Sequence, residues 1–536
     1  MVNTKSSIQS VIPQPWLRRD WINLFWLISF AAVLRLILFN GFFGSDDLVY
    51  LDRSIEIAQG VWTSADYNGA LRYGYNIPAA LFIYLFGLNI YTANAWAFLC
   101  SLAEIAVVYF FATQFLNRQV AILAALLLAT IPLHIALATR IHADSVMAFF
   151  LTLSFVLFCL AEHSGRRLLY FAAGLAMGMI FWVKELGVIT LLVFASYPIL
   201  VRRLDRNWWY VIAGGLIMLI GHLILMQIIA GDPLHLIKTV TGQVERGFIH
   251  GGIGADSPGY YFWYLFVDIK HTWFAPLIAA VALIWVFIQR RHTHPTLIYI
   301  AWWLLGLLII LSFLPVSLSP LRFALKQSNY LNLFLAPIVL LCASLLRSVS
   351  GFWPKILTTV VLVGGILLGA LEQQAYQNFT ANSRAAVVFL KSQPDEWMVG
   401  STNNGNWARI YALLDQDPSL VQRFGYFLPD GKMSLTQIRS VHGFALFDWE
   451  TMYWGSSTKL DKVPVCWEEV EMIQPSPSGL GRYVLSTVGS ISNMLPPPLN
   501  GKVAEKIHMI STPKSATIYR VDANNLDCKM ADSRTN

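Results

Sequence analysis

The feature that most constrains this chain is the repetition of apolar runs that approach 20 residues in length, separated by short polar breaks. A helix needs about 20 mainly apolar residues to cross the hydrocarbon core of a bilayer, so each run is predicted to be a membrane span. The chain is 56% hydrophobic and 13% charged, whereas roughly a quarter of an ordinary soluble domain is charged. We therefore expect a polytopic α-helical membrane protein.

The length rule predicts about eleven spans along the chain. They cover residues 21–39, 92–115, 119–136, 145–161, 168–183, 186–201, 209–230, 272–289, 296–314, 330–346 and 355–371. The first run, Trp21 to Phe39, is longer than the apolar region of a cleavable signal, about 7–15 residues, and no small-residue cleavage site follows it. It is expected to remain as the first anchor.

Lysine and arginine gather in every second break between the predicted spans, and short basic loops stay on the cytoplasmic side. The N-terminus is therefore predicted to be cytoplasmic, and an odd number of spans places the C-terminal segment outside. We expect a multi-pass protein of a prokaryotic plasma membrane. The opposite breaks are longer and chemically more varied, and functional residues are expected there: residues 40–91, 137–144, 184–185, 231–271 and 315–329.

From about Glu372 the composition changes to a polar and apolar mixture with Gly, Pro, Asn and Asp turns. Residues 372–536 are predicted to form a separate extracytoplasmic domain of mixed α/β structure, with strands at 482–487 and 516–521. Residues 1–371 then form the membrane module, including the outer loops 40–91 and 231–271. Cys466 and Cys528 lie in the polar part, and the sequence leaves open whether they form a disulfide.

The sharpest local feature is the acidic pair Asp46 and Asp47, a few residues beyond the first span. Carboxylates beside lipid are costly unless they are solvated, paired or used. One interpretation is a solvated acidic turn or helix cap. The other is that one carboxylate accepts a proton from an attacking nucleophile while its neighbour orients the site or binds a divalent cation.

Several cationic side chains lie in or near the same predicted outer loops. Each one alone is explained by snorkelling of its charge to lipid head groups, whereas the whole set beside an acidic pair favours a pocket for an anionic, lipid-linked ligand such as a phosphate. The set is Arg35 in the first span, Arg72, Arg140 with His142 and Asp144, Lys184 with Glu185, and Arg322 with Lys326.

The order of these motifs over residues 20–345 resembles the GT-C glycosyltransferases, most closely their protein O-mannosyltransferase-like and aminoarabinose-transferase-like branch. The matching segments are FAAVLRLILF, Asp46-Asp47-Leu48-Val49-Tyr50, LRYGYNIPAALFIYLFG, Arg140-Ile141-His142-Ala143-Asp144, AGLAMGMIFWVKELGVI, GDPLHLI and LKQSNYLNLFLAP. The chain departs from the family in three places. Asp47 stands where Glu is commoner, Tyr73-Gly74 replaces two prolines after Arg72, and no proline precedes Asp144.

The resemblance implies an inverting transfer of a hexosyl or pentosyl group from a polyprenyl-phosphate carrier to an acceptor at the outer membrane face. It implies that Asp46 is the base or an essential acid, with Asp47 as its support and Asp144 as a second acid. The residues implied to neutralise the carrier phosphate are Arg72, Arg140, Lys184, Arg322 and Lys326. The further candidates are Tyr50, His142, His250 and Tyr330.

The expected partners are the lipid-linked sugar donor, membrane lipids, and a lipid, glycan or protein acceptor. Nucleic acid is not expected, because the net charge of +7 is not gathered on an arginine-rich arm or face. A cofactor is left open: a divalent cation is possible, with Asp46 and Asp47 as its ligands.

Two other classes of function remain open at this point. One is a transporter or flippase, although the chain lacks the paired Gly/Pro-broken helices typical of such proteins. The other is a non-catalytic receptor or assembly subunit. The oligosaccharyltransferase branch of GT-C is disfavoured because its Trp-Trp-Asp-Tyr-Gly signature is absent; Asp448-Trp449-Glu450 and Tyr453-Trp454-Gly455 are only fragments of it.

Overall fold

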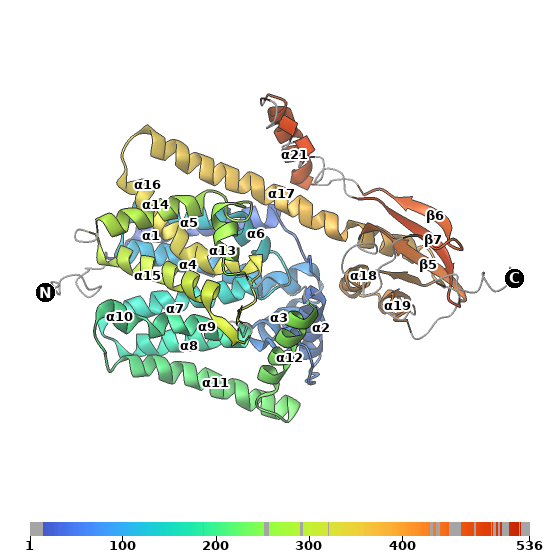
Figure 1. The fold of residues 1–536 in the computed structure, drawn as a ribbon, viewed down its shortest axis with the longest axis horizontal. Helices are drawn as coiled ribbons and strands as arrows, with labels where there is room; N and C mark the ends of the chain where they lie inside the picture. Colours follow the sequence, from blue (N-terminus) through green and yellow to red (C-terminus); the bar gives the residue numbers. More distant parts are fainter. Residues whose placement is uncertain are drawn as a thin grey trace. The chain divides into compact units, whose positions relative to one another are not determined.

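The structure is a computed structural model of the chain (Figure 1). It describes residues 14–44, 46–185, 187–250, 257–289, 293–319, 321–428, 433–435, 440–449, 462–475, 479–494, 496, 500–501, 504–505, 507, 514–524 and 526, with the backbone alone at 246–250, 479, 482 and 492. The chain divides into two compact units. The membrane unit comprises Met1–Phe39, Arg53–Leu85 and Asn94–Gly369, and the C-terminal unit comprises Asn40–Asp52, Phe86–Ala93 and Ala370–Asn536.

The membrane unit is built almost entirely of helices. Their bounds are α1 Arg18–Ile37, α2 Asp46–Ala58, η3 Asn68–Leu71, α3 Tyr73–Phe86, α4 Ile90–Phe115, α5 Arg118–Thr130, α6 Pro132–Ala138, α7 Asp144–Ser164, α8 Arg167–Val183, α9 Gly187–Ala195, α10 Tyr197–Val201, α11 Trp208–Ala230, α12 His235–His250, α13 Tyr260–Phe266, α14 Ala275–Ile288, α15 Pro295–Phe313, η4 Ser328–Phe334, α16 Leu335–Ser348 and α17 Phe352–Lys391. Helices α2, α3, α4 and α17 contribute to both units. A hairpin of β1 Pro315–Leu318 and β2 Leu321–Phe323 precedes η4.

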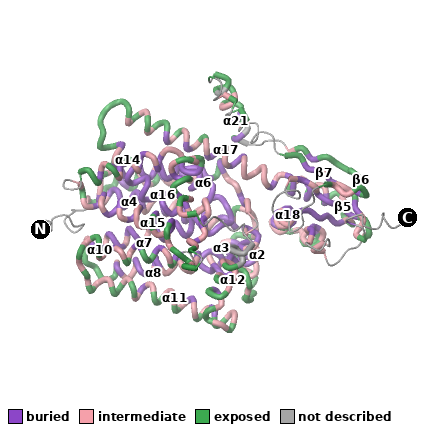
Figure 2. Tube along the Cα trace, viewed as in Figure 1, coloured by how far each residue is buried: buried purple, intermediate pink, exposed green. Residues whose placement is uncertain are grey.

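Among the described residues, seven helices are long and apolar enough to cross a membrane, or eight if the bent pair α5–α6 is one span. Three shorter apolar helical segments fall at other predicted spans: Arg167–Val183, Gly187–Val201 and Ala275–Ile288. The prediction of a multi-pass helical membrane protein is confirmed. Figure 2 shows the contrast expected for such a bundle, because α7 is mostly buried while α11 consists mainly of intermediate and exposed residues.

The predicted span over 119–136 is bent by 64° between α5 and α6. Pro132 has no amide hydrogen and interrupts the helical ladder. The amide of Leu133 instead donates to the carbonyl of His271 (3.0 Å), and the carbonyl of Ala129 accepts from the Arg35 guanidinium (3.4 Å). A side chain from the first span therefore satisfies a backbone group at the bend.

Arg35 belongs to a buried polar network within the membrane unit. Its guanidinium also donates to Ser101 Oγ (2.9 Å) and to His134 Nδ1 (2.6 Å), and His134 Nε2 lies 3.1 Å from a carboxylate oxygen of Glu104. Because Nδ1 accepts from Arg35, the imidazole proton is assigned to Nε2, which donates to Glu104. The second Glu104 oxygen accepts from Thr152 Oγ1 (2.8 Å). These contacts join helices α1, α4, α6 and α7.

Helices α8 and α11 approach one another closely because glycines face each other between them. A Cβ on Gly174 would lie 2.0 Å from the carbonyl oxygen of Val211, and a Cβ on Gly214 would lie 2.3 Å from that of Phe171. Small residues are the usual means of such close helix packing in lipid. The contact fixes α8, which ends at the residue before Lys184.

The C-terminal unit holds a five-stranded sheet with strand order β4-β3-β5-β7-β6. Strands β3, β4 and β5 are parallel, while β7 pairs antiparallel with both β5 and β6. The bounds are β3 Met398–Gly400, α18 Thr402–Leu414, α19 Pro418–Arg423, β4 Phe424–Tyr426, β5 His442–Phe447, β6 Glu468–Ile473, α21 Gly479–Ser492 and β7 Ala516–Asp522. The described residues of this unit thus combine a sheet with helices.

Three details of this region differ from the sequence-based expectation or extend it. The predicted strand at 482–487 is part of α21, because the apolar side chains Leu480, Val484, Leu485 and Val488 recur at helical spacing. The predicted strand at 516–521 is β7. Helix α17 continues to Lys391 without a break at 371. Cys466 is disulfide-bonded, while Cys528 lies outside the described residues.

A candidate active site at the N-terminal end of helix α7

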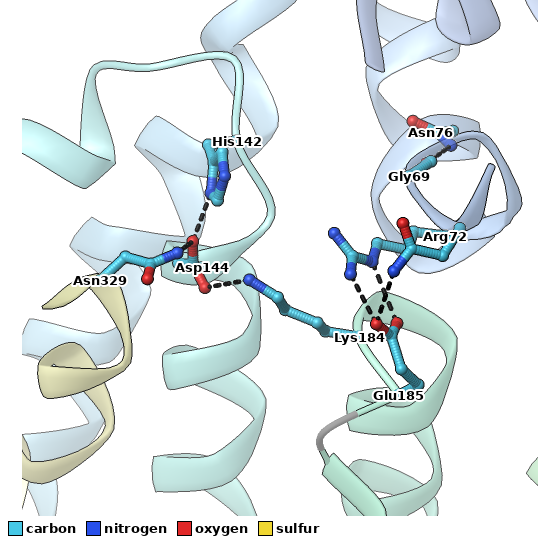
Figure 3. A network of polar contacts seen from close by, with 9 residues as sticks. Gly69, Arg72, Asn76, His142, Asp144, Lys184, Glu185 and Asn329 are labelled. Atoms are coloured by element: carbon cyan, nitrogen blue, oxygen red, sulfur yellow. Dashed lines mark hydrogen bonds and ion pairs between the residues drawn. The ribbon is translucent and has the colours of Figure 1, made fainter. Parts of the chain in front are cut away.

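Asp144 begins α7 and is the centre of a buried ion cluster (Figure 3). One carboxylate oxygen accepts from Lys184 Nζ at 2.9 Å. The other accepts from Asn329 Nδ2 at 2.7 Å and forms an ion pair with His142 Nδ1. Both oxygens of Asp144 are therefore occupied. These contacts favour the interpretation that Asp144 is the counter-ion of Lys184 and His142.

Lys184 caps the C-terminal end of α8 and reaches across to α7 and η4. Its ammonium lies 4.4 Å from the ring centroid of Tyr330, a cation–π contact of ordinary length. Asn329 and Tyr330 are neighbours in η4, so a single turn supplies both an amide for Asp144 and a ring for Lys184. The side chain of Lys184 is 3% exposed. A buried ammonium of this kind needs its carboxylate partner.

The residue after Lys184 makes a second ion pair, on the other side of the break between α8 and α9. Glu185 accepts from Arg72 through both carboxylate oxygens, at 3.1 Å to Nε and 2.7 Å to a terminal nitrogen, and also from Asn68 Nδ2 at 2.9 Å. The amide of Asn76 donates to the carbonyl of Gly69 (3.0 Å) and so holds the η3 turn that ends at Arg72 (Figure 3).

Gly74 explains why Arg72 can reach Glu185. A Cβ at Gly74 would lie 2.8 Å from Val183 Cγ2 and 2.9 Å from the backbone of Trp182 and Val183. The first turn of α3 therefore packs directly on the last turn of α8, which only glycine permits. The position at which the chain departs from the family's two prolines is thus where the backbone contact forms.

Two opposing effects determine the pKa of the Glu185 carboxyl, namely its burial and the neighbouring Arg72 guanidinium. Burial by itself would raise the pKa of the Glu185 carboxyl, but the Arg72 guanidinium outweighs it and holds that pKa below its ordinary value. Glu185 is therefore ionised at neutral pH. The ion pairs of the cluster join Arg72 to Glu185 and Lys184 to Asp144, and His142 makes a further contact with Asp144.

An apolar cavity of about 470 Å³ opens beside this cluster, between α7, α8, α9, α10 and α11. Its wall includes Gly187, whose amide donates to the carbonyl of Lys184 (2.9 Å). It also includes Tyr197 and Trp208, which both bind Glu162 near the other end of α7. The lining is otherwise aliphatic and aromatic, so the space suits a hydrocarbon chain.

The acidic pair lies in segment Asn40–Asp52, which clusters with the C-terminal unit. Asp46 is the first residue of α2 and is half-buried. Asp47 is buried, and its Oδ2 accepts from the backbone amides of Phe43 (2.6 Å) and Gly44 (3.2 Å). Tyr50 is fully buried on the same helix. Asp47 therefore holds the turn that precedes α2, and Asp46 is the first residue of the helix.

The remaining candidate residues lie in several places. Arg140 is buried and lies in the loop between α6 and α7. Arg322 is a half-buried residue of β2, and Lys326 is buried with its ammonium donating to the carbonyl of Ala324 (2.9 Å). His250 ends α12, and its side chain lies outside the described residues. In the described part of the chain, no group of three or more His, Cys, Asp or Glu side chains is arranged to hold a metal ion.

The structure adds two residues to the cluster that the sequence did not single out, Asn68 and Asn329. Each contacts a carboxylate more than 100 positions away in the chain. Asn329 lies in the segment LKQSNYLNLFLAP, which the sequence analysis matched to the family. Its neighbour Tyr330 was a predicted site residue, and this adjacency was the available signal for Asn329. Nothing in the sequence marks Asn68.

Comparison with family models gives one match. Residues 75–225 match the model described as dolichyl-phosphate-mannose-protein mannosyltransferase. The matched region contains Arg140, His142, Asp144, Lys184 and Glu185. A comparison with curated proteins finds no match.

Comparison with solved structures gives similar folds at low sequence identity. The oligosaccharyltransferase of Archaeoglobus fulgidus in the apo form has a TM-score of 0.53 and 10% identity, over 95% of this chain and 90% of that chain. The same enzyme in complex with Zn and sulfate has a TM-score of 0.51 and 12% identity, over 92% and 88%. ArnT from Cupriavidus metallidurans in the apo state has a TM-score of 0.46 and 18% identity, over 75% and 73%.

Residues 75–225 therefore resemble a protein mannosyltransferase family, and the fold resembles that of a solved oligosaccharyltransferase. The resemblance inferred from the sequence motifs is confirmed.

Proposed function

We propose that the chain transfers a sugar from a polyprenyl-phosphate carrier to an acceptor at the outer face of the membrane, with Asp46 as the base or an essential acid. The observation that carries the proposal is the buried ion cluster around Lys184 at the break between α8 and α9, together with the apolar cavity that Gly187 and Val188 line just after that break. A lipid-linked phosphate has the matching chemistry, an anionic head on a hydrocarbon chain.

The cations of the cluster are proposed to receive the phosphate. As the bond between the sugar C1 and the phosphate oxygen breaks, the departing phosphate gains negative charge, and fixed cations stabilise it in a site shielded from water. Lys184 and Arg140 are the proposed contacts, with Asp144 and Glu185 holding the cluster in place. Arg72 is tied to Glu185 on both of its oxygens, so its proposed role is to orient the break after α8.

The acceptor side of the reaction is proposed to depend on the acidic pair. An acceptor hydroxyl attacks C1 from the face opposite the phosphate and gives its proton to the Asp46 carboxylate, which inverts the configuration at C1. Asp47 is proposed to support the turn, since its Oδ2 is engaged by two backbone amides. The polyprenyl phosphate leaves as an anion, so the protons and charges balance.

The apolar cavity is proposed to take the carrier's first isoprenoid units. The similarity to the oligosaccharyltransferase fold does not identify the acceptor, because one fold can serve several reactions. The sequence also lacks the oligosaccharyltransferase signature. The donor sugar and the acceptor are left to be identified by experiment.

The test uses the full chain in lipid nanodiscs, a panel of polyprenyl-phosphate sugars and a cell-envelope extract as the source of acceptor. We expect transfer by the wild-type chain, and a loss of at least about 10²-fold on Asp46→Asn. Retained transfer after Asp46→Asn combined with Asp47→Asn would remove the acidic pair from the reaction.

Cavity filling gives an independent test of the donor class. Leu191 lines the cavity, and Leu191→Trp is expected to raise the KM for a long-chain donor while leaving that for a short-chain analogue within about twofold. Movement of an intact lipid-linked sugar across the bilayer without transfer would instead support the flippase alternative.

A further inference from the structure

The acidic turn is attached to the C-terminal unit by two aromatic side chains. Phe43 packs against Tyr376 and Phe379 of α17, with ring centroids 4.5 Å and 5.1 Å apart. Phe42 packs edge-on against Tyr411 of α18 at 4.8 Å. Both phenylalanines come directly before Gly44 and the acidic pair, and all of these residues belong to the C-terminal unit.

The same residues lead to the carboxylate of Asp47 through the backbone. Asp47 Oδ2 accepts from the amides of Phe43 and Gly44, so the turn whose side chains bind α17 and α18 is the turn whose amides bind the acid. Tyr411 Oη lies 3.2 Å from Thr380 Oγ1, which joins the two helices behind the turn. The contacts run without a gap from the helices of the C-terminal unit to the acidic pair.

Two polar contacts hold the flanking parts of the same segments. Asp52, one and a half turns along α2 from Asp47, forms an ion pair with Arg409 of α18 at 3.2 Å. The side-chain amide of Gln416 donates to the carbonyl of Leu88 (3.3 Å). Both segments of the first half of the chain that cluster with the C-terminal unit are thus attached to α18 or to the residues just after it.

We infer that the C-terminal unit positions the acidic pair, and that Phe43, Tyr376, Phe379, Tyr411 and Arg409 are positioning residues for the transfer reaction. The inference rests on the proposed function of Asp46. It gives residues 372–536 a task in catalysis that does not require them to bind the acceptor. Asp46 follows the anchored turn immediately, so loosening the turn moves the carboxylate away from the acceptor hydroxyl.

The chain offers a matched pair of phenylalanines for the test. Phe379 and Phe389 are both half-buried on α17, and each makes aromatic contacts within the C-terminal unit, but Phe389 packs on Phe444 of the sheet at 5.0 Å and not on the acidic turn. Phe379→Leu is expected to lower kcat about tenfold with the donor KM within about twofold, because it displaces a catalytic group without touching the donor. Phe389→Leu is expected to keep kcat within about twofold.

A charge exchange gives a rescue experiment. Asp52→Arg and Arg409→Asp are each expected to lower kcat about threefold, a modest effect because both side chains are partly exposed. The double variant is expected to recover to within about 1.5-fold of wild type, since the pair is restored in reverse. Lys391→Asp, which breaks a surface pair with Asp415 in the same unit, is the control and should leave kcat unchanged.

All variants are measured as full chains in nanodiscs, with thermal unfolding followed in parallel. Equal effects of Phe379→Leu and Phe389→Leu on kcat, or no recovery in the exchanged pair, would overturn the inference. If Asp46→Asn abolishes transfer while Phe379→Leu leaves kcat unchanged, the inference fails and the proposed function stands. If Asp46→Asn retains transfer, the proposed function of the acidic pair fails.

Discussion

The two ends of helix α7 carry buried carboxylates in very different company. Near the C-terminal end, Glu162 accepts from Tyr170 (2.8 Å), Trp208 (2.7 Å) and Arg203 (2.6 Å), and lies 3.3 Å from the hydroxyl of Tyr197. At the N-terminal end, Asp144 is held by Lys184, His142 and Asn329. Both carboxylates are 2% exposed.

The difference lies in the charge that each end can offer to a ligand. Three of the four donors to Glu162 are neutral, and its single cationic donor is one-third exposed. These contacts indicate a structural link between helices. At the Asp144 end, the buried Lys184 ammonium and the His142 imidazole both contact the carboxylate, beside the break after α8. Burial of a carboxylate is therefore no guide to function, whereas the cationic character of its donors is.

The largest expected effect comes from removing the cation at each end in turn. Lys184→Met is expected to lower kcat/KM by about 10²- to 10³-fold, because it removes a charge that stabilises the leaving phosphate. Arg203→Met should stay within about threefold of wild type in kcat/KM. Steady-state rates in nanodiscs measure both, and equal losses would remove the distinction between the two ends.

The two carboxylates themselves give the next largest difference. Asp144→Asn leaves Lys184 buried beside a neutral amide, and we expect kcat/KM to fall about 30-fold because the ammonium loses its fixed position. Glu162→Gln keeps most of its hydrogen bonds and should affect thermal unfolding more than rate. The comparison is contradicted if Glu162→Gln lowers the rate as much as Asp144→Asn.

A smaller effect is expected at the second ion pair. Arg72→Lys keeps the charge but loses the two parallel hydrogen bonds to Glu185, since an ammonium cannot reproduce the planar fork. We expect about a fivefold fall in kcat, with Arg118→Lys as the control because Arg118 binds Asp20 in the first turn of α1. If the two variants have the same kcat, the Arg72–Glu185 pair is not part of the site, which then consists of Asp144 and Lys184.

The pH dependence of stability offers the smallest and most specific signal. Because Arg72 holds the pKa of Glu185 below its ordinary value, the pair's stabilisation is fully present above about pH 4.5 and is lost as the pH falls through the folded-state pKa. The difference in Tm between the wild type and Glu185→Gln should therefore be constant from pH 8 to about 6 and shrink on acidification. A difference that grew on acidification would reverse the assigned sign.

Sequence reasoning succeeded where the physical signal was local. Apolar length located the spans because a membrane helix satisfies its own backbone within one segment. It missed the bend at Pro132 because the lost hydrogen bonds are replaced by Arg35 and His271, and neither lies close to the bend in the sequence. The strand predicted at 482–487 failed because a six-residue window is too short to separate strand alternation from helical spacing.

The candidate site was predictable as residue types but not as an arrangement. Lys184, Asp144, His142 and Tyr330 were each identified, and the structure brings them together. Asn329 and Asp144 are 185 positions apart, and no sequence pattern sets that contact. The attachment of Phe42 and Phe43 to helices more than 300 positions later was equally invisible, because it depends on side-chain packing alone.

Arg35 also constrains the order in which the protein is assembled in the membrane. Its partners Ser101, Ala129 and His134 all follow it by more than 60 positions, while synthesis proceeds from the N-terminus. Arg35 lies in the last turn of α1, so without its partners it costs less to insert than the about 2.5–3.5 kcal/mol of an arginine at the centre of a span, but it is still unfavourable. The first helix therefore enters the bilayer as an unfinished element, and we expect it to stay close to the insertion machinery until the third predicted span arrives.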